Sequence, residues 1–174
     1  MKPHFAIPAA VGAMLLAACS MNPRTAGPAA EAKMQPTQGS QTQGVVRFQQ
    51  HGDNVLVAAS FTGLAPGGHG FHIHEKGDCS APDASSAGGH FNPTGKPHGH
   101  PHKGEHHVGD LPMLTADANG NASLNATLTS LTLHEGASNI VGRAVIVHKD
   151  PDDFTTQPTG NSGGRLACGV IVAR

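Results

Sequence analysis

The segment GVVRFQQHGDNVLVAASF, residues 44–61, sets the expected fold of this chain. Apolar and polar side chains largely alternate along residues 45–50 and 54–61, which is the pattern of a strand with one buried face. The tripeptide HGD (residues 51–53) between the two runs favours a tight hairpin turn. We therefore predict two neighbouring antiparallel strands here.

Working outward from this hairpin indicates further strands. MLTADANGNASLNATL (113–128) places an Asn-Gly pair, a strong hairpin signal, between two alternating segments. NIVGRAVIVH (139–148) and LACGVIVA (166–173) are apolar and β-branched, as expected for strands on the core side. No window of useful length has the apolar stripe of a helix. We predict an all-β protein, an antiparallel sandwich or barrel, with long loops at 75–110 and 149–165 that serve binding.

The composition indicates one domain rich in turns. The 174 residues include 23 glycines, 13 prolines and 13 histidines, but no tryptophan or tyrosine. This much glycine and proline favours turns and short strands over long helices, and the length suits a single domain. The formal charge of −1 argues against nucleic acid or an anionic membrane surface as a partner.

The N-terminus has the features of an export signal. Lys2 precedes an apolar run that is too short to span a bilayer. The run ends in Leu-Ala-Ala-Cys at residues 16–19, which resembles the lipobox of bacterial lipoproteins. We expect a signal peptide at 1–18 and a lipid on Cys19 that anchors the chain at the periplasmic face of the cell envelope. Ser20 in place of an aspartate favours the outer membrane, and an ordinary signal with a chance cysteine is the alternative.

The residues after the signal contain no apolar periodicity up to residue 43. We therefore interpret 19–43 as the lipidated cysteine followed by a flexible linker. The folded domain is then expected at 44–174. A lipid at Cys19 would be its sole membrane contact.

Three cysteines must be assigned. If Cys19 is acylated, Cys79 and Cys168 remain, and a disulfide between them is expected in an oxidising compartment. Such a bridge closes a loop of roughly ninety residues, for which chain entropy gives at most about 4–5 kcal/mol of stabilisation. Two buried free thiols are the alternative.

A His-x-His pair marks the first candidate metal site. His72 and His74 lie two residues apart on an expected strand, so both rings share one face. Such pairs are also common on surfaces. His148 ends a buried strand that could neighbour this pair, and one further histidine would complete the four-nitrogen environment that copper(II) prefers.

The second candidate site lies in HFNPTGKPHGHPHKGEHHVGD (90–110), which holds six of the thirteen histidines. Glycine and proline exclude a helix here. His98, His107 and Asp110, together with His90, make an N3O set suited to tetrahedral zinc. A solvated low-complexity loop is the alternative.

Four motifs occur in order: GFHIHEKGDCSAPDASSAGGHFNP, HVGDLP, VIVH and GGRLACGV. Together they resemble copper/zinc superoxide dismutases of the bacterial exported type, in a lipoprotein form. The resemblance spans roughly residues 44–174. It implies a Greek-key β-sandwich or barrel that uses copper and zinc to dismutate superoxide into dioxygen and hydrogen peroxide.

The resemblance also assigns roles to residues. It implies copper ligands at His72, His74, His90 and His148. It implies zinc ligands at His90, His98, His107 and Asp110, so that the His90 ring is shared and takes part in catalysis. Asp152 would fix the orientation of one copper and one zinc histidine, and Arg165 would attract the anionic substrate. The alternatives are a surface carboxylate for Asp152 and a rim salt bridge for Arg165.

His100, His102 and His106 match no ligand of the family. They are interpreted as solvated loop residues, with capture or transfer of scarce metal as the alternative. A lipoprotein that stores or delivers copper and zinc without turnover is accordingly the second function considered, and a relative that has lost its chemistry is the third. Superoxide is the expected small-molecule partner, and a homodimer is possible.

Overall fold

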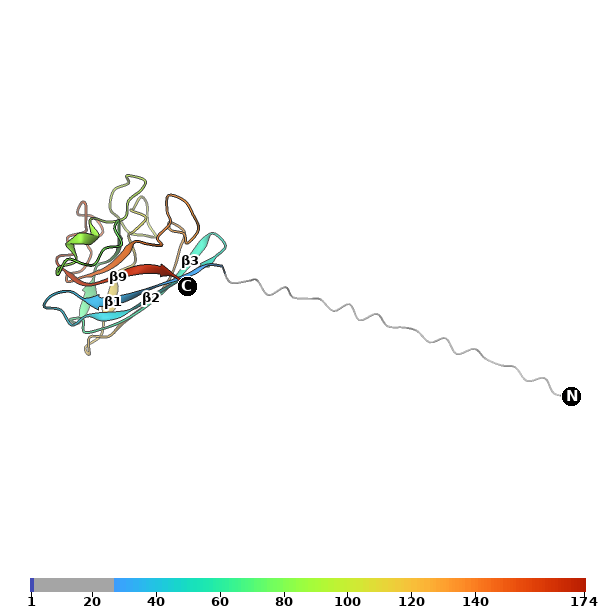
Figure 1. Ribbon diagram of the computed structural model, residues 1–174, viewed down its shortest axis with the longest axis horizontal. Helices are drawn as coiled ribbons and strands as arrows, with labels where there is room; N and C mark the ends of the chain where they lie inside the picture. Colours follow the sequence, from blue (N-terminus) through green and yellow to red (C-terminus); the bar gives the residue numbers. More distant parts are fainter. Residues whose placement is uncertain (2–26) are drawn as a thin grey trace.

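The computed structural model describes Met1 and residues 27–174, so the expected signal peptide and Cys19 lie outside the described residues (Figure 1). The strands are β1 (Ala29–Pro36), β2 (Gln43–His51), β3 (Asn54–Thr62), β4 (Gly67–His69), β5 (Phe71–His74), β6 (Leu114–Ala116), β7 (Ala122–Leu128), β8 (Ala144–His148) and β9 (Arg165–Ala173). One 3-10 turn, η1 (Ser85–Ala87), lies between β5 and β6. Within the described part of the chain, no helix is long and apolar enough to cross a membrane.

The sheet is antiparallel and nearly closes on itself. Its strand order is β4-β6-β7-β3-β2-β1-β9-β8-β5. The two end strands, β4 and β5, are separated in the chain by Gly70 alone. The Gly70 N–H donates to the Asp150 carbonyl at 2.9 Å, and the Gly70 carbonyl accepts from the His148 N–H at 2.8 Å. The predicted all-β, antiparallel sandwich or barrel is confirmed.

Both predicted hairpins are present. β2 and β3 pair from His51↔Asn54 outward, and alternate residues of β3 are buried, as period two requires. In the second hairpin, β6 meets β7 at Ala116↔Ala122. The turn between them needs a left-handed residue, and Gly120 supplies it with a φ of 77°.

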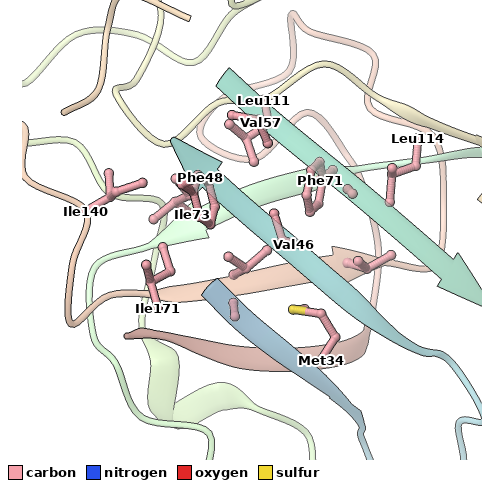
Figure 2. Packing of buried hydrophobic residues seen from close by; sticks show 14 of the residues in the cluster. Met34, Val46, Phe48, Val57, Phe71, Ile73, Leu111, Leu114, Ile140 and Ile171 are labelled. Atoms are coloured by element: carbon pink, nitrogen blue, oxygen red, sulfur yellow. The ribbon is translucent and has the colours of Figure 1, made fainter. Parts of the chain in front are cut away.

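The hydrophobic core packs against one side of β5, and the two histidines of the strand lie on the other side. Figure 2 shows Phe71 and Ile73 among the packed apolar side chains, and both are fully buried. Phe61 meets Phe71 edge to face, with ring centroids 5.8 Å apart. Because side chains alternate along a strand, His72 and His74 point to the opposite side. All four residues of β5 are nonetheless buried, so the histidine side is also covered.

The predicted linker at 19–43 is wrong over residues 29–36, which form strand β1. This strand pairs with β2 and with β9, so it lies inside the sheet and the folded part begins before residue 44. The buried side chains Ala30, Ala32 and Met34 do alternate. The pattern was missed because two of the three are alanine, which gives little hydropathic contrast, and because Glu31 is buried between them with two arginine partners from β2 and the C-terminus.

The expected long loops connect β5 to β6 and β8 to β9. The predicted disulfide joins the first of these loops to the sheet. Cys79 of the loop is bonded to Cys168 of β9, with Cα atoms 5.8 Å apart and 89 residues of sequence separation. The loop is thereby tied to the strand that begins at Arg165.

Candidate metal centre

Four buried histidines meet on the side of β5 that faces away from the core. We call His72, His74, His90 and His148 the four-histidine cluster; one donor atom from each lies within 4.8 Å of the others. The β5 pleat supplies the first two, and the end of β8 supplies His148. The long loop supplies His90, whose backbone forms an isolated bridge with that of His74.

Hydrogen bonds fix which ring nitrogen each of these histidines offers. His74 Nδ1 donates to the Gly88 carbonyl at 2.9 Å, and His148 Nδ1 donates to the Gly163 carbonyl at 3.2 Å, so the Nε2 atoms carry lone pairs. These two Nε2 atoms are 3.4 Å apart. Two lone pairs at this distance repel each other, and a cation bound between them would relieve the repulsion.

The remaining two rings have buried nitrogens without partners. His72 Nδ1 and His90 Nε2 make no hydrogen bond to any described residue, although both are buried. Buried polar atoms are rarely left unpaired, since this costs about 1–3 kcal/mol each. The four-histidine cluster therefore presents four nitrogen donors, two of them without a partner in the described part of the chain, and fits a metal ion such as copper.

A second group adjoins the first through His90. We call His90, His98, His107 and Asp110 the carboxylate cluster. His90 Nδ1 and His98 Nδ1 each lie 3.0 Å from Asp110 Oδ1, and His107 Nδ1 lies 3.3 Å from His90 Nδ1 and 3.4 Å from Asp110 Oδ1. A tetrahedral zinc ion with bonds of about 2.0–2.1 Å holds its ligand atoms about 3.3 Å apart. The four separations given, 3.0–3.4 Å, are close to that requirement.

A looser grouping of donor atoms places His72, rather than His107, with His90, His98 and Asp110. His72 Nε2 already contacts the Asp152 carboxylate at 2.7 Å. His107 offers a nitrogen at 3.3–3.4 Å from two members of the carboxylate cluster. We therefore include His107 and not His72.

Two buried carboxylates hold these rings in place. Asp152 bridges the two clusters, because Oδ2 contacts His72 Nε2 at 2.7 Å and Oδ1 contacts His98 Nε2 at 2.9 Å. Asp110 Oδ2 accepts from the backbone N–H groups of Gly99 and His107 at 3.0 and 2.9 Å, which leaves Oδ1 for the cluster. The expected orienting contacts of Asp152 are thus observed.

The two clusters differ in their electrostatics. Burial lowers the pKa of His148 to about 3 and, with a smaller contribution from His72, lowers the pKa of His90 to about 4. Burial also acts on His98, but hydrogen bonds to Asp110 and Asp152 outweigh it and raise the pKa of His98 to about 9. The hydrogen-bonded histidines hold the pKa of both carboxyls well below the usual range despite burial.

Arg165 lies beside the four-histidine cluster. It pairs with His148 across β8 and β9. Its guanidinium donates to the carbonyls of Ala84 and Gly88 at 2.6 Å each. The Gly88 carbonyl also accepts from His74, so one loop carbonyl positions both the cation and a cluster ring.

The surplus histidines stand outside both clusters. His102 is exposed, and His100 and His106 are partly exposed. The rings of His100 and His102 are 5.9 Å apart, and His100 also packs against Phe154 with centroids 4.7 Å apart. These contacts agree with the interpretation of loop residues.

Sequence reasoning missed several supporting groups. The carbonyls of Gly88 and Gly163 select ring tautomers, yet a backbone carbonyl has no signature in the sequence. His69 is buried with Nδ1 2.9 Å from the His148 carbonyl. The Gln157 side chain binds the backbone of His98. Each role depends on contacts between residues that are distant in the sequence.

Comparison with known proteins agrees with this geometry. The family model for copper/zinc superoxide dismutase matches residues 42–171. A crystal structure of the clock protein EA4 is similar to this chain, with 40% sequence identity and a TM-score of 0.75. The match covers 83% of this chain and 93% of that chain.

Proposed function

The chain belongs to the copper/zinc superoxide dismutase family, and from this membership we propose that it dismutates superoxide with a copper and zinc pair. In the reaction, two superoxide anions and two protons give one dioxygen and one hydrogen peroxide. One observation carries the proposal. The His90 ring has Nδ1 inside the carboxylate cluster, 3.0 Å from Asp110 Oδ1, while its buried Nε2 has no partner among the residues described.

The tautomers and contacts support an assignment of each donor atom. Copper would be held by His72 Nδ1, His74 Nε2, His90 Nε2 and His148 Nε2. Zinc would be held by the Nδ1 atoms of His90, His98 and His107 together with Asp110 Oδ1. A ring that binds through both nitrogens must lose both N–H protons, which two adjacent dications favour.

Copper supplies the electron transfer, because it alternates between two oxidation states and zinc does not. The protein's own groups supply ligation, access and protons. Asp152 keeps the His72 and His98 rings in fixed orientations through its two oxygens. His90 Nε2 is the atom at which the chain can hold one of the two protons that the reaction consumes.

Arg165 would attract and orient the substrate. The guanidinium is partly exposed and its position is fixed by two carbonyl acceptors, so its charge stays at the edge of the four-histidine cluster. A fixed positive charge beside a cation-binding site raises the local concentration of small anions. The Cys79–Cys168 bridge ties the same loop to β9 and keeps these acceptors in register.

An activity assay with a matched variant tests the proposal. The wild-type protein loaded with copper and zinc is expected to dismutate superoxide. His74→Ala removes a member of the four-histidine cluster whose ring nitrogens contact the Gly88 carbonyl and His148 but no donor atom of the carboxylate cluster. We expect this variant to lose copper and activity while it retains one zinc. A wild-type protein that binds both ions but shows no turnover would refute the enzyme assignment.

Storage or delivery of metal is the second candidate, and the three surplus histidines of the long loop, which are exposed or partly exposed, favour it. A storage protein is expected to bind more than one copper ion or more than one zinc ion per chain at equilibrium. It should lose the excess ions when His100, His102 and His106 are replaced. The enzyme predicts one ion of each kind and no effect of these replacements on turnover.

We also propose that the protein acts outside the cytoplasm, lipid-anchored at Cys19 on the periplasmic face of the envelope. The Cys79–Cys168 disulfide supports an oxidising compartment. Mass analysis of the membrane fraction would test it, because Cys19→Ser should abolish the diacylglycerol mass and release the protein.

A further inference from the structure

The loop between β8 and β9 contacts one histidine of the carboxylate cluster in three ways. Asp152 Oδ1 accepts from His98 Nε2 at 2.9 Å. The side-chain amide of Gln157 binds the backbone of the same residue: Oε1 accepts from the His98 N–H at 2.8 Å, and Nε2 donates to the His98 carbonyl at 2.9 Å. Gly160 lies against the first contact, since a Cβ there would stand 2.6 Å from His98 Nε2.

The two hydrogen bonds from Gln157 hold the His98 backbone as a residue of a paired β-strand would. Donor and acceptor of one planar amide meet the carbonyl and the N–H of one residue, so the peptide groups on both sides of the His98 Cα are fixed together. In residues 27–174, the backbone of His98 makes no other hydrogen bond. The direction of the His98 side chain therefore depends on Gln157 at one end and on Asp152 at the other.

The segment that supplies these contacts is internally braced. The Asp153 N–H donates to the Gly160 carbonyl at 3.0 Å, and the Gly160 N–H donates to the Thr156 carbonyl at 2.7 Å. Phe154 packs against the ring of His100, two residues after His98. Gln157 thus extends from a compact turn rather than from a loose loop, which lets a single exposed side chain hold a buried ligand residue.

We infer that Gln157 is a positioning residue for the zinc ion, acting through the backbone of His98 so that His98 Nδ1 lies 3.0 Å from Asp110 Oδ1. This inference rests on the proposed function, which assigns zinc to the carboxylate cluster. Gln157 is itself exposed, so its truncation leaves no cavity in the core. A general effect on folding and a specific effect on zinc are therefore separable.

The test compares Gln157→Ala with Thr159→Ala in the full-length, metal-free protein with its disulfide intact. Thr159 is an exposed residue of the same turn whose side chain makes no hydrogen bond to the described residues. Zinc affinity is measured by competition with a chelator, and Co²⁺ reports the geometry of the site through its visible spectrum. We expect about a tenfold loss of zinc affinity and a weaker tetrahedral Co²⁺ band for Gln157→Ala alone. Gln157→Glu keeps an acceptor for the His98 N–H and should lose less.

The outcomes separate the inference from the function on which it rests. Unchanged zinc affinity and an unchanged Co²⁺ spectrum in Gln157→Ala would overturn the role of Gln157 and leave the zinc assignment intact. Equal losses of zinc affinity, copper affinity and thermal stability would also overturn it, since they indicate general loosening. A wild-type protein that binds no zinc would contradict the proposed function and this inference together.

Discussion

The four-histidine cluster and the carboxylate cluster share one ring but are built from different parts of the chain. The first takes His72 and His74 from β5 and His148 from β8, so ladder hydrogen bonds hold most of it. The second takes all its members from the loop between β5 and β6. One of its members, His98, is held by a second loop: Asp152 contacts the ring and Gln157 bonds to the backbone. The geometry of the four-histidine cluster, the copper side, therefore depends mainly on the sheet. The geometry of the carboxylate cluster, the zinc side, depends on contacts between two loops.

The clusters also differ in the protons that their histidine rings carry when no metal is bound. Burial lowers the pKa of His148 to about 3 and that of His90 to about 4, so these rings stay neutral and ready to bind a cation. Asp110 and Asp152 raise the pKa of His98 to about 9, so a proton occupies that ring at neutral pH. A metal ion that binds the carboxylate cluster must therefore displace the proton on His98. A metal ion that binds the four-histidine cluster meets the His148 and His90 rings already neutral.

The largest expected effect comes from Gly160→Ala, which should weaken zinc binding because it disturbs the contact between Asp152 and His98. A Cβ at this position would overlap the Asp152 carboxylate and approach His98 Nε2. We expect zinc affinity to fall about 10–100-fold.

Gly95→Ala is the matched control for this change. Gly95 has nearly the same φ, 65° against 64°, but nothing lies within 4 Å of its Cβ position. Both variants suffer the same backbone strain, so any difference in zinc affinity reports the contact alone. Equal affinities in the two variants would contradict the role given to the Asp152–His98 contact.

The pH dependence of metal binding should sharpen the same contrast. Below its pKa of about 9, metal-free His98 carries a proton that zinc must displace. Zinc affinity should therefore rise with pH, by about tenfold per unit between pH 7 and 8. His148 and His90 are already neutral there, so copper alone should show no such slope from these rings. Competition titrations of each ion at several pH values measure both slopes, and identical slopes would contradict the comparison.

The smallest expected effect concerns the approach of substrate to the copper side. Arg165 is the cation beside the four-histidine cluster, and the loop that follows His148 adds only Lys149. Because added salt screens exposed charges, kcat/KM should fall by about threefold between low and physiological ionic strength. Arg165→Gln should flatten this dependence, whereas Lys33→Gln at an exposed position of β1 should not. A steep salt dependence that survives Arg165→Gln would place the steering charge elsewhere.

The sheet and its histidines could be predicted from the sequence more fully than the contacts between the two loops. Period-two alternation identified β2 and β3, and the His-x-His pair on β5 needed only the pleat of a strand to bring both rings to one side. The residue types of His98, His107 and Asp110 indicated a zinc set, but no local pattern brings His98 and His107 together, so their assignment as ligands depended on a resemblance to a known family. The role of Gln157 was not predictable, because it joins loops 59 residues apart. Strand β1 was missed for a different reason, the weak contrast of its alanines.

The central claim is that the ring of His90 is shared by two different metal ions. A crystal structure of the fully loaded protein, with anomalous data at the copper and zinc absorption edges, tests it most directly. We predict a copper peak next to His90 Nε2 and a zinc peak next to His90 Nδ1, each at a bonding distance of about 2.0–2.1 Å. A ring of residue 90 that binds one ion only, or neither, would contradict the account.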